Sequence, residues 1–236
     1  MFRKIKLNET KLKKPHNSRI WLILPTKNPT KETLKIIEYF YCKMNVLVID
    51  DGSTINIELL KNIKNKILLI TNKKNMGKGF SIKKALKTIL NKKKVVGAII
   101  ADSDGQHSIN DIQKIYNLFS KNPEKFILGQ RKFKILNTPL RNYFGNFITS
   151  LIFLLKFKIY IDTQCGLRAM PIKYMNKAIV LNGNDYSFEM KQLIEIISIN
   201  KNDLKFINIK TIYKKNIKSY FNPISDSISI FKKLLK

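Results

Sequence analysis

The stretch VVGAIIADSDGQH, residues 95–107, begins with seven small or apolar residues and runs straight into two aspartates, a glycine, a glutamine and a histidine. A short continuous apolar run is typical of a strand that is buried on both faces of a parallel sheet. Similar runs occur four more times, at residues 20–24, 45–50, 66–71 and 125–129. These runs predict five strands of a mostly parallel sheet.

Helical patterns separate the predicted strands. Asn28 and Pro29 have the types of an N-cap and a first helical residue, and Ser108 with Asp111 resembles the start of a capping box. Apolar residues between 82 and 90 recur at the spacing of an amphipathic helix. The alternation predicts a single, doubly wound α/β domain whose ligand crevice lies at the carboxyl ends of the strands.

Aspartates follow two of the predicted strands, at 50–51 and at 102–104. In an extended segment alternate side chains share one face, so Asp102, Asp104 and Gln106 are expected to converge. Oxygen ligands suit Mg²⁺ or Mn²⁺, which also takes substrate phosphates and waters. The alternative is that Asp104 and Gly105 form a turn where the strand ends.

Two other motifs compete with this interpretation. A P-loop is excluded because MGKGFS lacks the glycine four residues before its Gly-Lys pair. A phosphatase of the haloacid-dehalogenase type would use Asp102 as nucleophile and Asp104 as acid and base. That resemblance requires Thr or Val in place of Gln106 and a later acidic pair, whereas the later aspartates are isolated: Asp162, Asp185, Asp203 and Asp226.

The composition is that of a strongly basic protein with enough apolar residues to form a hydrophobic core. The 236 residues are 44% hydrophobic and carry a net charge of +29, with 45 basic and 16 acidic residues. Only five of the basic residues are Arg, and the lysines are dispersed, either through compositional drift or to attract anionic partners. Nucleic-acid binding is typically marked by clustered Arg and aromatic residues, so no nucleic-acid partner is expected. Two cysteines indicate a reducing cytosol.

Seven motifs, in this order, closely resemble the family 2 glycosyltransferases of the GT-A fold: LPTKNPT (24–30), VIDDGST (48–54), NKKNMGKGFSIKKAL (72–86), IIADSDGQH (99–107), LGQRKF (128–133), RNYFGN (141–146) and DTQCGLRAM (162–170). The branch they look most like is that of dolichol-phosphate mannosyltransferase and the polyprenyl-phosphate glycosyltransferases. The resemblance covers residues 19–215 as one GT-A domain. It leaves a basic N-terminal extension at 1–18 and an amphipathic C-terminal segment at 216–236.

The resemblance implies a metal-dependent transfer of a sugar from a nucleotide-sugar donor to a membrane-borne acceptor, a polyprenyl (dolichyl or undecaprenyl) phosphate. It assigns Mg²⁺ or Mn²⁺ to Asp102, Asp104 and Gln106. It assigns the nucleotide sugar to Pro25, Asp51, Gly79, Asp102 and Ser103. The catalytic residues would be Asp104, Arg131 and Arg168, and the acceptor phosphate would meet Arg141 and Arg168. For Arg168, a structural ion pair is the alternative.

Two alternatives of function remain open. A lipid phosphate is already ionised and needs no general base, whereas a glycolipid hydroxyl needs one, for which Asp162, Asp185 and Glu189 are the candidates. A protein of another class, with the fold kept and catalysis weakened, would simply bind anionic membranes. Lys27 and Pro29 replace the aromatic and acidic residues usual in the family. Family members use this segment around the nucleotide base, so the resemblance does not imply which nucleotide is bound.

The apolar segment 141–161 suggests how a lipid acceptor is reached. Its centre, FITSLIFLL, is nine residues long, well short of the roughly 20 apolar residues that span a bilayer. It is expected to form either a buried core helix or an interfacial helix, with 219–236 as a second amphipathic segment. We expect a protein on the cytoplasmic face of a membrane, in peripheral contact with anionic lipid.

Overall fold

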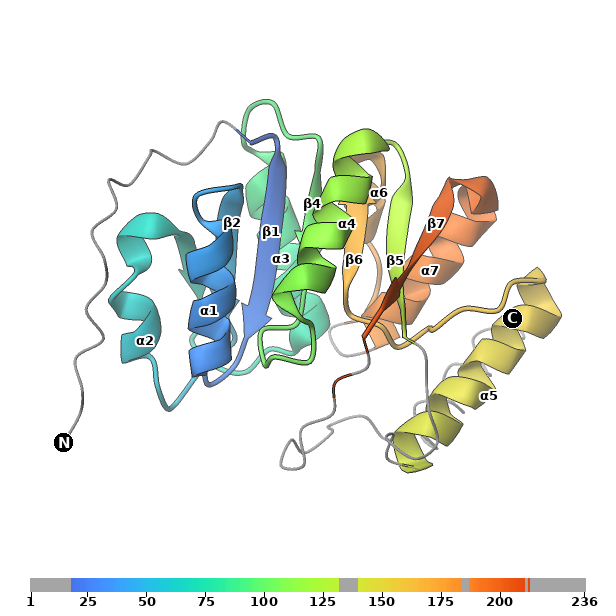
Figure 1. Ribbon diagram of the computed structural model, residues 1–236, viewed down its shortest axis with the longest axis horizontal. Helices are drawn as coiled ribbons and strands as arrows, with labels where there is room; N and C mark the ends of the chain where they lie inside the picture. Colours follow the sequence, from blue (N-terminus) through green and yellow to red (C-terminus); the bar gives the residue numbers. More distant parts are fainter. Residues whose placement is uncertain (1–17, 132–139, 184–186, 211, 213–236) are drawn as a thin grey trace.

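A single seven-stranded sheet organises the molecule (Figure 1). The computed structural model describes residues 18–131, 140–183, 187–210 and 212. Within them the strand order is β3-β2-β1-β4-β6-β5-β7. The strands are β1 (Ile20–Thr26), β2 (Asn45–Asp50), β3 (Leu68–Thr71), β4 (Gly97–Ile100), β5 (Phe126–Arg131), β6 (Arg168–Pro171) and β7 (Leu204–Ile209).

Only β6 runs against its neighbours. It pairs antiparallel with both β4 and β5, whereas every other pairing in the sheet is parallel. The mostly parallel α/β domain expected from the apolar runs is therefore confirmed. The five predicted strands are present, and β6 and β7 are additions that the apolar runs did not predict.

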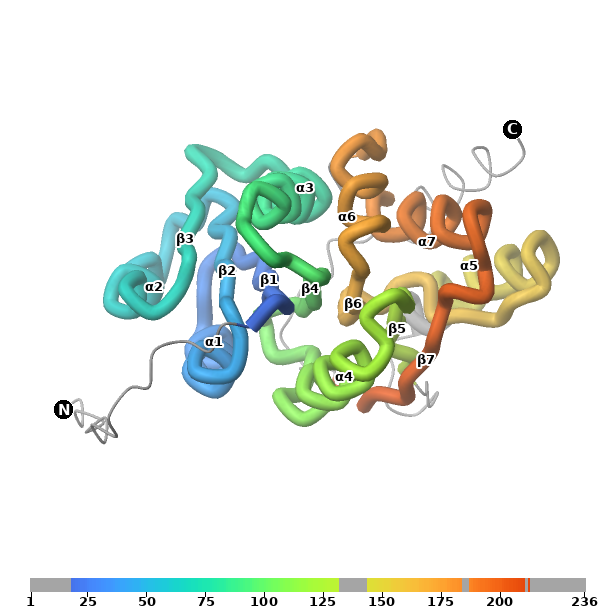
Figure 2. The backbone as a smooth tube through the Cα atoms, turned by 90° about the horizontal axis from the view of Figure 1, so that it is seen from above, coloured from blue at the N-terminus to red at the C-terminus, as the bar shows by residue number. Residues whose placement is uncertain are grey.

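Helices cover both faces of the sheet. They are α1 (Lys31–Phe40), α2 (Glu58–Lys61), α3 (Lys78–Leu90), α4 (Ile109–Lys121), α5 (Leu140–Phe157), α6 (Ile172–Ala178) and α7 (Ser187–Asn200). Seen from above, α1 and α4 lie on one side of the sheet and α3, α6 and α7 on the other (Figure 2). This is the doubly wound arrangement.

Two helix starts test the capping predictions. Ser108 caps α4 as expected, since its Oγ accepts a hydrogen bond from the backbone N of Asp111 at 3.1 Å. The prediction for α1 was wrong about the N-cap, because Thr30 and not Asn28 takes that position. Asn28 adopts a φ of 56° and its side chain accepts from the backbone N of Thr54 at 3.1 Å. Asn28 therefore fastens the loop after β1 to the loop after β2.

The core fixes the carboxyl edge of the sheet. Leu22, Ile23 and Leu24 of β1 are fully buried, and β4 is buried along its whole length. β2 and β4 flank β1 and run parallel to it, so their carboxyl ends lie at one edge. The aspartates that follow β2 and β4 are brought to that edge, as predicted.

Of the predicted outer segments, residues 1–17 and 216–236 lie outside the described residues, so the amphipathic C-terminal segment stays a prediction. Segment 141–161 forms most of α5, which lies outside the sheet toward the end where β1 terminates (Figure 1). In the part of the chain that the structure describes, no helix combines the length and the apolar character needed to cross a bilayer.

Candidate active site

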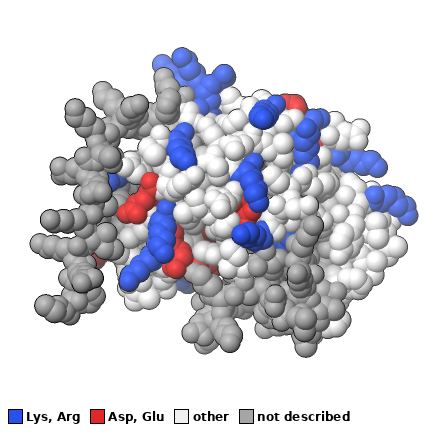
Figure 3. Space-filling view, in the orientation of Figure 1, with Lys and Arg blue, Asp and Glu red and all other residues white. Residues whose placement is uncertain are grey.

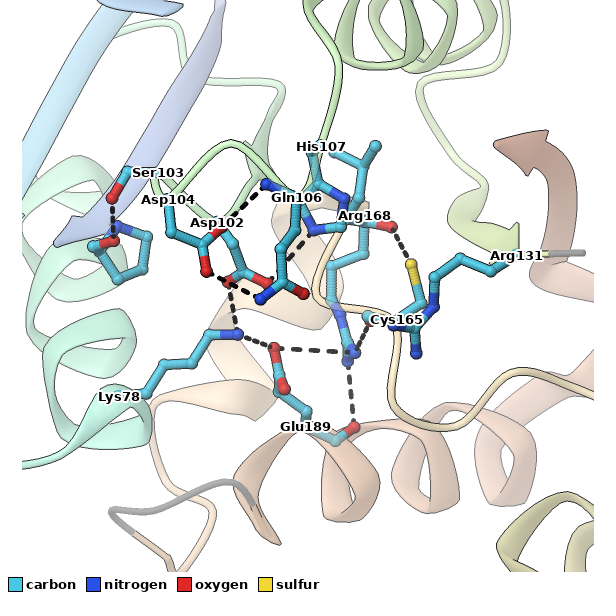
Figure 4. A network of polar contacts seen from close by, with 12 residues as sticks. Lys78, Asp102, Ser103, Asp104, Gln106, His107, Arg131, Cys165, Arg168 and Glu189 are labelled. Atoms are coloured by element: carbon cyan, nitrogen blue, oxygen red, sulfur yellow. Dashed lines mark hydrogen bonds and ion pairs between the residues drawn. The ribbon is translucent and has the colours of Figure 1, made fainter. Parts of the chain in front are cut away.

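The loop that follows β4 carries the aspartate at the centre of the site (Figure 4). One carboxylate oxygen of Asp102, Oδ1, lies 2.5 Å from Lys78 Nζ. The other, Oδ2, lies 3.2 Å from His107 Nε2. Lys78 is the first residue of α3, and His107 stands just before α4. The carboxylate is thereby held between the starts of two helices on opposite faces of the sheet.

Asp104 and Gln106 are brought together, but not by the alternation that predicted it. β4 ends at Ile100, and the chain then bends, with a φ of 87° at Gly105. In this bend Asp104 Oδ1 accepts from the backbone N of Gln106 and Oδ2 from its side-chain Nε2, each at 2.9 Å. The turn interpretation therefore holds, and the turn brings Asp104 and Gln106 together. Convergence of both with Asp102 on one metal ion stays a prediction.

The two aspartates respond in opposite ways to their surroundings. Burial would raise the pKa of Asp102, but the charge of Lys78 and the hydrogen bond to His107 outweigh it and hold that pKa well below its usual range. Burial raises the pKa of Asp104, and the negative charge of Asp102 raises it further. The two carboxylates are thus close enough for the charge of Asp102 to act on Asp104.

Two further charged residues, Glu189 and Arg168, extend the network around Asp102 and Lys78. Lys78 Nζ also lies 3.0 Å from Oε1 of Glu189 on α7. Arg168 of β6 is 1% exposed, and its NH1 donates to the backbone O of Glu189 and to Gln192 Oε1, each at 3.0 Å. Its NH2 donates to the backbone O of Cys165 at 2.5 Å. The guanidinium therefore ties β6 to α7, and these bonds would have to open for it to reach a phosphate.

Asp51, expected at the nucleotide sugar, is 6% exposed and faces the chain that leads to α3. Its Oδ1 accepts from Asn72 Nδ2 and from the backbone N of Met76, and its Oδ2 from the backbone N of Gly77, all at 2.9 Å. In this structure Asp51 anchors loop 72–77. It sets where α3, and with it Lys78, begins.

The other residues expected at the donor surround the same edge. Ser103 Oγ donates to the backbone O of Pro25 at 3.0 Å, which joins the ends of β4 and β1. The backbone O of Ser103 accepts from Thr33 Oγ1 of α1 at 2.9 Å. Gly79 is buried in the first turn of α3. Pro25, Ser103 and Gly79 thus lie at the carboxyl edge, and their contact with a nucleotide sugar remains a prediction.

Arg131, at the end of β5, is held by Asp162. Its Nε and NH2 lie 2.6 Å and 2.9 Å from Oδ2 and Oδ1 of that carboxylate, a bidentate pair. Asp162, a candidate base, is therefore the ionic partner of a candidate catalytic residue. Arg141 stands in the first turn of α5, but its side chain, like the whole of Asp185, lies outside the described residues.

The residues present fit a divalent cation of the oxygen-binding type. Within the described ranges no three His, Cys, Asp or Glu side chains gather as a metal site. The cation expected from the sequence would rest on two carboxylates and one amide, those of Asp102, Asp104 and Gln106. Burial and the negative charge of Asp102 raise the pKa of Asp104, so its ionised form is disfavoured at this place. A cation between the two aspartates would favour that form, and the remaining positions would suit waters and phosphate oxygens.

Sequence reasoning assigned no role to two residues that the site depends on. Lys78 holds Asp102 and Glu189 together, and His107 holds the second oxygen of Asp102. Both stand inside motifs of the family resemblance, Lys78 in MGKGFS and His107 directly after Gln106. A basic residue at the start of the helix that faces D-x-D was the available signal for Lys78.

The basic residues are spread over the molecular face in Figure 3, with acidic residues among them. They form separate groups on this face and no continuous stripe. The dispersion expected from the sequence is therefore visible on this face.

Two relatives were found by sequence. An uncharacterised protein of Methanocaldococcus jannaschii is 32% identical over an alignment of 164 positions, which covers 65% of this chain and 72% of that protein. The UDP-N-acetylglucosamine–dolichyl-phosphate N-acetylglucosaminyltransferase of Methanococcus voltae is 29% identical over 246 aligned positions, 92% of this chain and 94% of the relative. The second similarity spans nearly the whole of both chains.

Similarity in structure extends to enzymes of low sequence identity. The glucosyl-3-phosphoglycerate synthase of Mycobacterium tuberculosis, solved with Mn²⁺, UDP and glucosyl-3-phosphoglycerate, superposes with a TM-score of 0.66 at 12% identity. The match covers 91% of this chain and 76% of that one, which places both in the GT-A fold. The model of glycosyl transferase family 2 matches residues 22–179. The chain is therefore a glycosyltransferase that belongs to family 2 and has the GT-A fold.

Proposed function

We propose that the protein transfers a sugar from a nucleotide-diphosphate sugar to a polyprenyl phosphate, with a divalent cation bound at the donor. The observation that carries the proposal is the alignment, over nearly the whole of both chains, with a relative named for transfer of N-acetylglucosamine from UDP to dolichyl phosphate. UDP-N-acetylglucosamine is therefore the first donor to test, and dolichyl phosphate the first acceptor.

The cation is assigned to Asp102, Asp104 and Gln106, which lie within one bend at the carboxyl edge. Mg²⁺ or Mn²⁺ there would neutralise the diphosphate that leaves with the nucleotide, as a Lewis acid. His107 and Lys78 fix the orientation of Asp102, and such orientation of a ligand by its neighbours supports metal binding. The mycobacterial synthase was crystallised with Mn²⁺ and UDP, which is consistent with this assignment.

The carboxylates near the site favour a phosphate acceptor over a hydroxyl. A hydroxyl acceptor needs a base that takes its proton, and Glu189 and Asp162 are the described candidates. Glu189 lies 3.0 Å from Lys78, and Asp162 holds Arg131 through two bonds. Each would have to give up an ion pair to accept a proton. An acceptor that is already an anion requires cationic groups in place of a base.

For the acceptor phosphate we retain Arg141 and add Arg131. The side chain of Arg131 is 13% exposed at the end of β5, and Arg141 stands in the first turn of α5, the helix that follows β5 in the chain. Arg168 is better assigned to positioning, since its guanidinium is committed to backbone and side-chain acceptors on α7 and at Cys165. We expect it to hold Glu189 in place for Lys78.

α5 provides a surface for the membrane that carries such an acceptor. Four apolar side chains form one stripe on it and are 38–65% exposed: Ile148, Leu151, Leu154 and Leu155. The surrounding segment 132–161 contains five Lys or Arg and no acidic residue. Exposed apolar residues beside basic ones are what an anionic bilayer surface binds.

The same helix is connected to the site. Ser150 Oγ donates to the backbone O of Ile161, and Thr149 Oγ1 meets Thr163 Oγ1, each at 2.6 Å. Asp162, between these two anchor points, holds Arg131. A lipid phosphate presented at α5 would thus arrive beside the cationic end of β5. We infer a peripheral protein at the cytoplasmic face, a compartment in keeping with the free cysteines Cys42 and Cys165.

A transfer assay tests the reaction. The purified protein would be mixed with radiolabelled UDP-N-acetylglucosamine, Mn²⁺ and liposomes that contain either dolichyl phosphate or dolichol. We expect label to enter the lipid fraction only with the phosphate, and EDTA to abolish it. Preferred transfer to the alcohol, or to a glycolipid hydroxyl, would contradict the proposed acceptor and make Glu189 and Asp162 the bases to test.

Sedimentation with anionic liposomes tests the surface. The unaltered protein is expected to stay partly bound at high salt, because apolar insertion is not screened as ionic attraction is. The double variant Leu151→Ser/Leu155→Ser should be released by salt. Its matched control is Val180→Ser/Ile199→Ser, which changes apolar residues of similar exposure, the first just after α6 and the second on α7. Equal release of both variants would contradict a role for α5.

A further inference from the structure

Gly166 lies against the central carboxylate of the site, in the segment that leads into β6. A Cβ added to Gly166 would overlap Asp102 Oδ2 and would lie 2.9 Å from both Asp102 Cγ and Lys78 Nζ. Separations under about 3 Å are shorter than carbon and its neighbours tolerate, since van der Waals contact begins near 3.5 Å. Glycine is therefore the residue that leaves room for the carboxylate.

Backbone conformation does not explain the glycine. The glycines with positive φ are Gly52, Gly77, Gly105 and Gly183, and Gly166 is not among them. Gly166 is thus outside the left-handed region in which glycine is favoured over alanine. The requirement for glycine at this position is therefore steric, and it is set by the side chains that face Gly166.

The chain around Gly166 has little freedom to withdraw. The backbone O of Cys165, on one side, accepts from Arg168 NH2 at 2.5 Å. The backbone O of Leu167, on the other, accepts from the backbone N of Gly129 at 2.9 Å. An added methyl group would therefore be relieved by movement of Asp102, which would disturb its contacts with Lys78 and His107.

We propose that Gly166 is a positioning residue of the donor site: by leaving space beside β6 it lets the Asp102 carboxylate sit between Lys78 and His107. The functional part of this inference rests on the proposed function, in which Asp102 is a ligand of the cation. Gly166 itself touches neither the cation nor the substrate, and it acts through the orientation of Asp102.

Gly129 supplies the matched control. A Cβ at Gly129 would lie 2.9 Å from Ile209 Cδ1 and 3.1 Å from Cys165 Sγ, so it also meets a crowded place. The atoms it meets are the end of an apolar side chain, a thiol and a backbone carbonyl, with no carboxylate among them. Gly129→Ala is expected to disturb packing without changing Asp102.

A double-mutant cycle tests the positioning without any ligand. Melting temperatures would be measured in EDTA for Gly166→Ala, for Asp102→Ala, for the two combined, and for Gly129→Ala alone and with Asp102→Ala. We expect Gly166→Ala to lower the melting temperature by roughly 2 to 12 °C in the original chain and by clearly less once Asp102 is shortened. Gly129→Ala should lower it equally in both backgrounds, because its neighbours do not include Asp102.

Every outcome of the cycle decides the inference. If Gly166→Ala fails to fold alone but folds with Asp102→Ala, the overlap with the carboxylate is supported. An equal loss in both backgrounds, no loss in either, or failure to fold in both would overturn it.

Calorimetric titration of UDP in the presence of Mn²⁺ tests the consequence for the donor. Gly166→Ala should bind roughly ten- to a hundredfold more weakly, the usual cost of disturbing a group that orients a metal ligand, and Gly129→Ala should bind like the unaltered chain. Unchanged binding in Gly166→Ala would overturn the positioning role. If the unaltered chain itself fails to bind UDP, the assignment of UDP as the donor nucleotide fails, and the cycle still decides whether Gly166 positions Asp102.

Discussion

Asp104 and Asp203 are both aspartates at strand ends, but they lie at opposite edges of the sheet and differ in their partners. Asp203 precedes β7 at its amino end and accepts hydrogen bonds from Lys173, Tyr174, Lys125 and Asn200, at 2.5 to 3.3 Å. The hydrogen bond from Lys173 is the largest influence that lowers the pKa of Asp203 to about 2. Asp104 accepts from the neutral amides of Gln106, and burial together with Asp102 raises its pKa.

The difference separates a structural carboxylate from one suited to a ligand. At Asp203 two lysines supply the positive charge from within the protein, so a further cation would gain little there. At Asp104 burial and the negative charge of Asp102 together raise the pKa, so an added cation would lower the free energy of the ionised carboxylate. In a chain with 45 basic residues, the carboxylate whose pKa is raised is the informative one.

The largest effect is expected from Asp104→Asn. The variant should lose Mn²⁺-dependent binding of UDP, and sugar transfer should fall by roughly a hundredfold or more, because a cation contributes several kcal/mol to stabilising the leaving diphosphate. The fold should persist, since the substitution removes the repulsion between two carboxylates. Calorimetry with UDP and Mn²⁺, beside circular dichroism, measures both. Binding that stays dependent on Mn²⁺ would contradict the assignment of Asp104.

Asp203→Asn is the opposite case. We expect a loss of roughly 1 to 3 kcal/mol in the free energy of unfolding, because the amide nitrogen cannot accept the bonds that Lys173 and Tyr174 donate. Urea denaturation measures this loss. Binding of UDP with Mn²⁺ should be unchanged once the variant is folded. If Asp203→Asn kept normal stability but bound UDP with Mn²⁺ more weakly, Asp203 would be the ligand-binding carboxylate, contrary to the contrast with Asp104.

Acidic pH should remove the contribution of Asp203. Its pKa is lowered from 3.8 to about 2 on folding, so the unfolded chain binds the proton more readily. The stabilisation is therefore fully present above the unfolded pKa of roughly 4 and is lost as the pH falls through about 2. The difference in unfolding free energy between the original chain and Asp203→Asn should be constant near neutral pH and shrink below about pH 4. A difference independent of pH would exclude ionisation of Asp203 as its source.

Most of the fold could be predicted because its main strands are buried on both faces. β1, β2, β4 and β5 are short apolar runs, and such runs are visible without knowledge of tertiary partners. β6 was missed because it begins with Arg168, whose charge is satisfied by acceptors on α7. β7 was missed because only its two ends are buried, so it lacks a continuous apolar run.

The geometry of the candidate site was predicted less well than the fold. Asp104 and Gln106 lie together because the bend at Gly105 folds the segment back, not because the chain is extended there. That they bind a metal with Asp102 stays a prediction. The inward orientation of Asp51 and Arg168 could not be read from their residue types. It depends on partners 21 to 26 positions away along the chain, which only the folded structure brings close.

The smallest effect is expected from Lys173→Met. Lys173 lies 2.5 Å from Asp203, but its side chain is 51% exposed, so solvent screens the ion pair. Lys125, Tyr174 and Asn200 would continue to donate to the carboxylate. The expected loss is under about 1 kcal/mol in the free energy of unfolding, smaller at high salt than at low salt.

Lys61→Met is the control for this last comparison, because Lys61 pairs with Glu58 at the surface, where both side chains are well exposed. Urea denaturation at low and high salt should show no measurable loss for Lys61→Met and a small, salt-dependent loss for Lys173→Met. A loss as large as that of Asp203→Asn would mean that Lys173 alone balances the carboxylate. The low pKa of Asp203 would then depend on the Lys173 ammonium alone. Its contrast with Asp104 would rest on that single residue and no longer on the four side chains that donate to Asp203.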